Sequence, residues 1–310
     1  MGEHNLVAID IADGDRVWTA GRFDHATSGP VVDGAVAVVA DERRAAYRPD
    51  GTAAWTVDDD DRGFRPHAAI DGRVVGGYNR ANAGVLAVDA ATGRRRWAVT
   101  PDEWPTAGGN YAAFDAVATG EGIVAAHFDG PLAGIDAIGD VLWSIDDDWD
   151  THGPGRPSLA ADVSTVVAAS GAVAGFDAAT GERRWRRVLP DFATGVTVAN
   201  GVAVVSVEGD TPKVDSWDEP GGVIAYDLAT GAERWRTPLD APAAAPGTGL
   251  GSVVVGMEAG TLVGLDREDG AVEWRRPVGD AVHTPPVGGS DQLFVGVRRD
   301  GTVAVVRLDR

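Results

Sequence analysis

The chain has 310 residues, 44% of them hydrophobic, and its 47 acidic residues outnumber 27 basic ones to leave a formal net charge of −20. This hydrophobic content supports a sizeable core, and the acidic surface disfavours nucleic acid as a partner. The lack of cysteine excludes disulfides, thiolate catalysis and cysteine–zinc sites.

The sequence also indicates where the protein does not insert. No apolar run approaches the ~18 residues that a membrane-spanning helix needs, so we expect no membrane insertion. The first residues, MGEHNLVAIDIADG, lack the pattern of a signal peptide. We therefore expect a cytoplasmic protein as the sequence is written, and an extracytoplasmic one if a leader was removed from a longer precursor. Nothing in the sequence predicts the oligomeric state.

The main feature along the chain is a unit of pattern A-x-D-x-x-T-G-x-x-x-W. It recurs, with variations, at residues 8–18, 47–55, 87–97, 134–143, 175–185, 225–235 and 264–274. The tryptophans that close these units are 37 to 50 residues apart: Trp18, Trp55, Trp97, Trp143, Trp185, Trp235 and Trp274. Such periods fit four-stranded propeller blades and are too long for leucine-rich or ankyrin repeats.

Each part of the unit has a local structural use. The apolar run 223–226 predicts a strand. Asp227 can accept hydrogen bonds from backbone amides of the next turn, and Gly231 can supply the positive φ that closes a bulged hairpin. Trp235 then begins the returning strand and can fill the wedge between adjacent sheets. Two further strand-like runs precede each unit, as in residues 29–40, which makes four strands per repeat.

The C-terminal repeat is incomplete, because only three strand-like runs, 285–287, 292–297 and 302–308, follow Trp274. We therefore predict an all-β chain that forms one β-propeller domain over residues 1–310, with seven four-stranded blades. The N-terminal strand at 17–20 would join the C-terminal blade and close the ring, which removes an open sheet edge. Residues 5–11 and 302–308 both have the pattern of a third strand. Three alternatives therefore stay open: a fifth strand in the closing blade, a displaced run, or an eight-bladed ring.

The repeated unit resembles the pyrroloquinoline-quinone-like propeller repeat, whose pattern is called the tryptophan-docking motif. The resemblance spans Leu6 to Asp309. It implies a propeller, and it implies one of several functions: a quinoprotein alcohol dehydrogenase, a lipoprotein that helps to assemble outer-membrane proteins, or a non-catalytic scaffold. The dehydrogenases hold their quinone under a Cys-Cys disulfide and bind calcium with Glu, Asn and Asp. The chain has no cysteine and no recognisable calcium set, so the resemblance argues against pyrroloquinoline quinone as a cofactor.

No catalytic motif is recognisable, and the catalytic residues, if there are any, stay unknown. The glycine-rich run GTGLGS at 247–252 precedes a strand rather than a helix, so we interpret it as a tight turn between strands. In the acidic run 146–153, Asp146, Asp148 and Asp150 resemble the start of a calcium loop. The alternative is that these aspartates, like those at 58–61, are solvated acids of a salt-adapted surface.

Four of the six histidines, His25, His67, His152 and His283, fall in the expected connections that lead into the first strand of a blade. Their functional interpretation is a metal or anion site at the mouth of the propeller channel. We favour the simpler interpretation that they are ordinary polar loop residues, because isolated imidazoles bind a metal only when their geometry converges.

Three tryptophans lie outside the repeat register. Trp104 and Trp149 fall in connections between blades, and Trp217 falls in a long insertion at 207–222. In an up-and-down blade these connections emerge at the same edge. Exposed aromatic residues on loops are typical of binding surfaces, although each could instead fold back over its own blade. We predict a non-catalytic module that binds a protein or peptide through this loop-rich face; the alternative is a quinone-dependent oxidoreductase or another enzyme at the channel mouth.

Lysine is almost absent, with Lys213 its sole example, and the bias toward Asp, Glu, Ala, Val and Arg resembles proteins of salt-loving archaea. Repulsion among surface carboxylates should be strongest at low ionic strength, where the Debye length reaches about 30 Å at 0.01 M salt. We predict that monovalent salt raises the melting temperature, mostly within the first few tenths molar. Thermal unfolding at stepped sodium chloride concentrations tests this, and calcium chloride at matched ionic strength separates screening from binding by the 146–150 aspartates. A melting temperature independent of salt would contradict the prediction.

Overall fold

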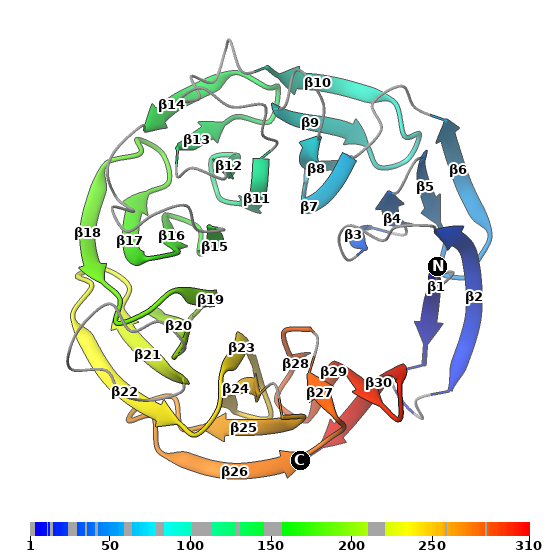
Figure 1. The fold of residues 1–310 in the computed structure, drawn as a ribbon. Helices are drawn as coiled ribbons and strands as arrows, with labels where there is room; N and C mark the ends of the chain where they lie inside the picture. The colour runs from blue at the N-terminus through cyan, green and yellow to red at the C-terminus, as the bar shows by residue number, and fades with distance from the viewer. Residues whose placement is uncertain are drawn as a thin grey trace. The chain divides into compact units, whose positions relative to one another are not determined.

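The computed structural model describes the chain apart from residues 1–3, 11, 13–14, 24–29, 35, 41–42, 59–63, 79–83, 101–112, 128–130, 146–156, 210–220, 258 and 283. The described part consists of thirty β-strands joined by turns and connections, and it contains no helix (Figure 1). Within these residues no helix is long and apolar enough to cross a membrane.

Six groups of four consecutive strands form antiparallel meanders, each called a blade below. The chain divides into two units: Met1–Asp147 with Ala178–Gly181, and Asp148–Asp177 with Glu182–Arg310. The first unit holds three blades: β3 (Val31–Asp33), β4 (Val36–Ala40), β5 (Arg43–Tyr47), β6 (Ala53–Asp58); β7 (Phe64–Ile70), β8 (Arg73–Tyr78), β9 (Gly84–Asp89), β10 (Arg95–Val99); and β11 (Ala113–Ala118), β12 (Ile123–His127), β13 (Leu132–Ile135), β14 (Val141–Ile145).

The second unit holds the other three blades: β15 (Ser158–Ala161), β16 (Thr165–Ala169), β17 (Ala172–Asp177), β18 (Arg183–Val188); β19 (Ala193–Ala199), β20 (Val202–Glu208), β21 (Gly221–Asp227), β22 (Glu233–Leu239); and β23 (Ala243–Gly249), β24 (Ser252–Met257), β25 (Thr261–Leu265), β26 (Val272–Pro277). The prediction of an all-β chain with four strands per repeat is therefore confirmed.

Both ends of the chain depart from the four-stranded pattern. At the N-terminus β1 (His4–Ile9) and β2 (Arg16–Phe23) form a two-stranded sheet. After β26 come β27 (Ala281–Val282), β28 (Val287–Gly288), β29 (Gln292–Arg299) and β30 (Thr302–Asp309), with β27, β28 and β30 all paired to β29. With the six blades, these two groups of strands make seven blades if they form one blade together, and eight if each forms a blade of its own. The joining of the N-terminal strand to the C-terminal blade stays a prediction, as does the single domain.

Burial along the strands shows how the blades pack. Every residue of β16 is buried, whereas the fourth strand β26 is largely exposed. Alternate side chains of β20 enter two different clusters: Val205 packs with Val167 of the preceding blade, and Val204 packs with Val255 of the following one. Because successive side chains point to opposite faces of a strand, β19–β22 must be covered on both faces, and Figure 1 shows it between β15–β18 and β23–β26.

Three hairpin turns between first and second strands, and the β29–β30 turn, have a common conformation. A residue with positive φ is followed by a glycine with positive φ at residues 71–72, 200–201, 250–251 and 300–301. This pairing is the requirement of a type I′ turn, which matches the twist of the flanking strands. Leu250 adopts φ 53° although it is neither Gly nor Asn, and its side chain packs in the core beside β29. The predicted tight turn at 247–252 is thereby confirmed.

The motif tryptophans lie on the fourth strands of the described blades, and on β2 at the N-terminus. Across its hairpin each faces a residue without a large side chain, because the indole covers that position. These register pairs are Ala8–Trp18, Ala46–Trp55, Ala87–Trp97, Gly134–Trp143, Gly175–Trp185, Ala225–Trp235 and Gly264–Trp274.

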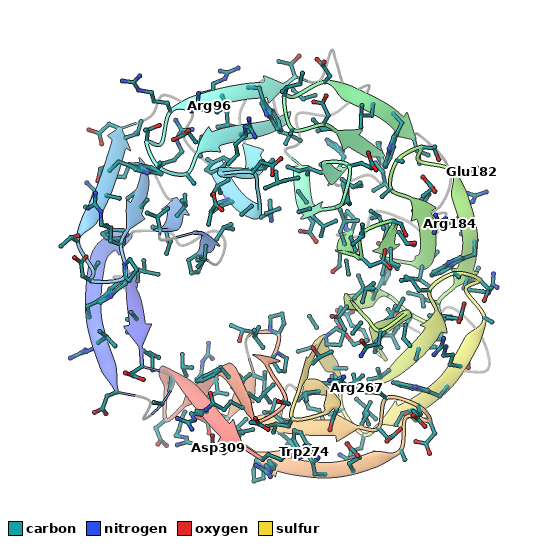
Figure 2. All side chains as sticks on the ribbon, turned by 180° about the vertical axis from the view of Figure 1, so that it is seen from behind. Arg96, Glu182, Arg184, Arg267, Trp274 and Asp309 are labelled. Atoms are coloured by element: carbon teal, nitrogen blue, oxygen red, sulfur yellow. The ribbon has the colours of Figure 1, made fainter. Side chains whose placement is uncertain are left out.

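The indole N–H groups link each repeat to the next one. Six of the motif tryptophans donate to a backbone carbonyl in the third-to-fourth-strand turn of the following repeat, at 2.7 to 3.1 Å. The pairs are Trp18–Pro49, Trp55–Ala90, Trp97–Ala137, Trp143–Ala178, Trp185–Leu228 and Trp235–Arg267. Trp274 packs on the C-terminal strands, with the Arg276 guanidinium 5.4 Å from the centre of its ring; Figure 2 labels Trp274 on β26.

The turn that receives the indole must contain glycine. Gly231 has φ 64°, and a Cβ at that position would overlap the Trp185 ring. The same ring stacks on Tyr226 with ring centroids 6.2 Å apart. The indole, the glycine and the tyrosine together seal the wedge between two blades.

We predict that Trp185→Ala lowers the free energy of unfolding by about 3–5 kcal/mol, because it removes a large buried side chain. Trp185→Phe should cost less, since it keeps the ring contact but loses the hydrogen bond to Leu228, a bond worth about 1 kcal/mol. Val188→Ala, on the same strand but half-exposed, is the matched control. Urea denaturation measures all three, and equal losses for Trp185→Ala and Val188→Ala would contradict the docking role.

Candidate functional site

The structure leaves several predicted site residues outside its described part. Trp104, Trp149 and Trp217 all lie there, and so do the proposed calcium ligands Asp146, Asp148 and Asp150. The strands on either side place the connections as predicted: β10 ends at Val99, β14 at Ile145 and β20 at Glu208. Within the described residues no group of three or more His, Asp or Glu side chains is placed to hold a metal ion.

The aspartates of the repeat act as turn caps. Asp227 Oδ1 accepts hydrogen bonds from the Thr230 amide at 3.0 Å and the Thr230 hydroxyl at 2.9 Å, and Oδ2 accepts one from Arg234 Nη2 at 2.7 Å. The bonds from Arg234 and Thr230 lower the pKa of Asp227 to about 2. Asp227 is therefore an ionised structural group at neutral pH, and the predicted bonds from the turn amides are confirmed.

A second polar cluster involves two first strands, β7 and β11. His67 and Arg65 lie on β7, and Asp115 on β11 comes within 3.6 Å of His67 Nδ1 through its Oδ1. His67 lies inside β7 rather than in the connection before it, so that expectation is wrong; His25, His152 and His283 lie outside the described residues. Burial, reinforced by the Arg65 charge, lowers the pKa of His67 to about 4 despite the nearby carboxylate. The imidazole is neutral at pH 7.

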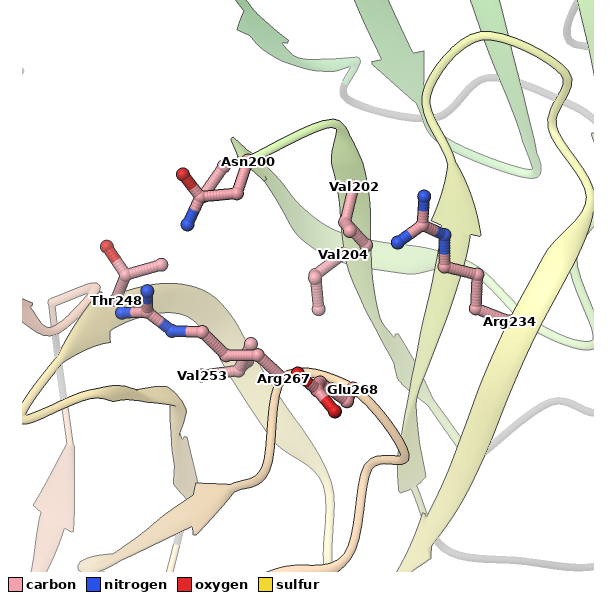
Figure 3. Close-up of a pocket in the computed structure, with 9 residues that line it drawn as sticks. Asn200, Val202, Val204, Arg234, Thr248, Val253, Arg267 and Glu268 are labelled. Carbon is pink, nitrogen blue, oxygen red and sulfur yellow. The ribbon is translucent and has the colours of Figure 1, made fainter.

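A pocket of about 450 Å³ lies between the blades β19–β22 and β23–β26. Its polar lining comes from turns and strand ends: Asn200 from the β19–β20 turn, Thr248 near the end of β23, Arg234 on β22, and Arg267 with Glu268 in the β25–β26 turn. The remaining lining is formed by Ala199, Val202, Val204 and Val253. Figure 3 shows the two guanidinium groups on opposite sides of Val204.

The docking contacts position both arginines. Arg234 precedes Trp235, and its Nη2 is held by Asp227. Arg267 supplies the backbone carbonyl that accepts the Trp235 indole N–H at 3.1 Å. Its turn is fixed by Asp266 Oδ1, which accepts the amides of Glu268 at 2.7 Å and Asp269 at 3.1 Å. The pocket is therefore built on rigid elements, and its walls are set by the contact between blades.

In the preceding blade, β15–β18, the arginine that corresponds to Arg234 has a different set of hydrogen-bond partners. There Arg184 donates from Nη2 to Asp177 at 2.7 Å and from Nη1 to the Thr165 hydroxyl at 2.6 Å (Figure 2 labels Arg184). Thr165 pairs with Asp177 in register, and Val202 pairs with Asp227 in the same way. Val202 thus stands where the neighbouring blade has a hydroxyl. The residue opposite the motif aspartate varies between blades, with Arg73 opposite Asp89 in β7–β10, so the repeat pattern gave no sequence signal for the pocket.

Blades of four antiparallel strands, joined by tryptophan docking, define a β-propeller of the pyrroloquinoline-quinone-like repeat type. The sequence matches the family model for outer membrane protein assembly factor BamB over residues 2–146, 129–214 and 219–310, and the chain belongs to this family. The resemblance stated from the motif is thereby confirmed. No curated protein sequence matches the chain.

Solved structures share the fold at low sequence identity. BamB from Moraxella catarrhalis is 20% identical with a TM-score of 0.71, covering 98% of this chain and 93% of its own. Sqt1 from Saccharomyces cerevisiae is 11% identical with a TM-score of 0.72, covering 99% and 90%. The quinohemoprotein alcohol dehydrogenase from Comamonas testosteroni is 15% identical with a TM-score of 0.68, covering 94% and 67%. These likenesses confirm the predicted propeller.

We predict that His67 destabilises the fold on mild acidification. The pKa of His67 is about 4 in the folded chain and about 6.5 in the unfolded one, so the unfolded state takes up the proton first. Stability should fall between pH 6.5 and 4, by on the order of 3 kcal/mol. Carboxyl groups with lowered pKa values, such as Asp227, change the stability only at a pH below this window. Urea denaturation at a series of pH values should show a smaller fall in the free energy of unfolding for His67→Gln than for the unchanged chain. Parallel curves for the two proteins would contradict the role of His67.

Proposed function

We propose that the chain is a non-catalytic β-propeller scaffold that binds a protein or peptide partner. The observation that carries this proposal is membership, over nearly the whole chain, of a family described as an assembly factor. The use of the repeat residues supports it further. Asp227 is a turn cap and Trp185 seals the wedge between blades, so the recurring motif serves the framework and leaves the connections for recognition.

The proposed contact surface is the loop-rich face, with Trp104, Trp149 and Trp217 as its anchors. Connections between blades and those between second and third strands leave an up-and-down blade at the same edge, and the proposal assigns Trp104, Trp149 and Trp217 to that edge of their blades. Aromatic side chains on loops above a rigid framework are enriched among residues that dominate binding energy. The net charge of −20 favours a partner with a basic or neutral surface over nucleic acid.

The alternative function is a quinone-dependent oxidoreductase, which the likeness in fold to the Comamonas testosteroni enzyme favours. The absence of cysteine removes the disulfide that the resemblance implies for the cofactor site. Addition of the quinone with calcium separates the two functions, because an oxidoreductase would develop cofactor absorbance and reduce a dye with alcohols or sugars. Calcium at Asp146, Asp148 and Asp150 stays a separate proposal, which needs no quinone.

We predict that Trp104→Ala combined with Trp217→Ala weakens capture of the partner by at least about tenfold, since interface tryptophans commonly contribute 2 kcal/mol or more. The measurement is crosslinking and mass spectrometry of extract from the source cells at their own salt concentration. Val163→Ser is the matched control, because Val163 is 75% exposed in a first-to-second-strand turn at the other edge of its blade. If the double tryptophan variant captures the same proteins as the Val163→Ser control, the loop-rich face is not the binding surface.

A further inference from the structure

The pocket between β19–β22 and β23–β26 has a chemistry that the scaffold function leaves unused. We propose that this pocket binds the carboxylate of a small monoanionic ligand with an apolar body. Arg234 and Arg267 hold the carboxylate, and Val202, Val204 and Val253 contact the body. The inference is independent of the proposed partner face, since the pocket is lined by turns at the opposite edge of the blades.

The pocket is rich in hydrogen-bond donors that lack acceptors within the described part of the chain. Arg267 Nε is buried there with no partner, and Arg267 Nη2 has only a long contact of 3.5 Å to the Ser252 carbonyl. Arg234 has one acceptor among the described residues, Asp227, which it reaches through Nη2. A guanidinium offers five N–H donors in a planar fork, so a planar acceptor with two oxygens satisfies it best.

The preceding blade differs from this one at the residue that faces the arginine. Arg184 has an acceptor for Nη1, the Thr165 hydroxyl at 2.6 Å, in addition to Asp177 for Nη2. The equivalent Arg234 faces Val202, which has no acceptor, so its remaining donors are directed at the pocket (Figure 3). The same exchange of threonine for valine adds an apolar wall. Val202 therefore removes one acceptor that Arg184 has in the preceding blade, and it supplies part of the contact for an apolar body.

Charge and size select the class of ligand. Two arginines and one carboxylate, Glu268, line the pocket, and Arg234 is also paired with Asp227, so the site has too little positive charge for a phosphate dianion and favours a monoanion. A volume of about 450 Å³ lies within the ordinary range for small-ligand sites, about 300–1,000 Å³. Three valines in the lining match a short branched aliphatic body. A free branched-chain organic acid and the C-terminal leucine of a peptide both present this chemistry.

The test is titration of the full chain with 4-methylpentanoate, followed by NMR chemical shifts at constant sodium chloride. Binding should perturb the amides of Asn200, Thr248 and Glu268. The uncharged amide of the same acid should bind at least about tenfold more weakly, because it cannot make the charge-assisted bonds. A second arm uses acetyl-Ala-Leu with a free or an amidated C-terminus; whichever carboxylate binds more tightly assigns the source as a free acid or a chain end.

Variants separate the site from general effects of charge. Arg267→Met and Val202→Thr should each weaken the acid about tenfold or more, the second because its hydroxyl engages Arg234 as Thr165 engages Arg184. Glu268→Gln should strengthen binding. Arg184→Met, the same change in the preceding blade, is the control and should leave the affinity unchanged. Thermal unfolding confirms that each variant is folded.

Three results would overturn the proposal. They are the absence of binding at millimolar acid, equal affinity for the acid and its amide, and tighter binding of inorganic phosphate than of the acid. Loss of binding in Arg184→Met to the same extent as in Arg267→Met would also overturn it. None of these results bears on partner capture by the loop-rich face, so the two proposals fail separately.

Discussion

The contact between a fourth-strand indole and the glycine turn of the next repeat is the interaction on which the structure depends. A four-stranded blade exposes two apolar faces, and neither is stable until another blade covers it. The indole fills the wedge between two blades, and its N–H satisfies a turn carbonyl, as Trp185 does with Leu228. One side chain thus provides both the apolar contact and the hydrogen bond between two blades, and it fixes their register.

This contact dictates the rest of the motif. The ring of Trp185 leaves no room for a Cβ at Gly175 across the hairpin or at Gly231 in the receiving turn. The turn must expose a carbonyl toward the ring, and Asp227 holds it in that shape through the Thr230 amide. An acidic, arginine-rich composition suits the design, because arginines on fourth strands pair with these aspartates, as in Arg96 with Asp89.

The two edges of each blade carry different kinds of connection, and this separates their functions. Short turns occupy the edge where Asn200 and Arg267 lie, and docking fixes the backbone of the turn that contains Arg267. Long connections leave from the other edge, after strand ends such as Val99 and Ile145. A short turn can hold a side chain precisely enough to line a pocket, whereas a long connection can vary in sequence without disturbing the blades. The repeat thus provides a framework on which two binding chemistries can coexist.

The sequence by itself determined the class of fold, the blades and their turns. Those features depend on local requirements: a positive φ at Gly231, a small residue opposite each indole, and an aspartate that caps the turn. Only the tertiary structure decided where the polar side chains converge. Asn200, Arg234 and Arg267 come from three turns or strands of two blades, and His67 meets Asp115 across two blades. Such contacts depend on how one sheet packs on the next, which the spacing of a repeat does not encode.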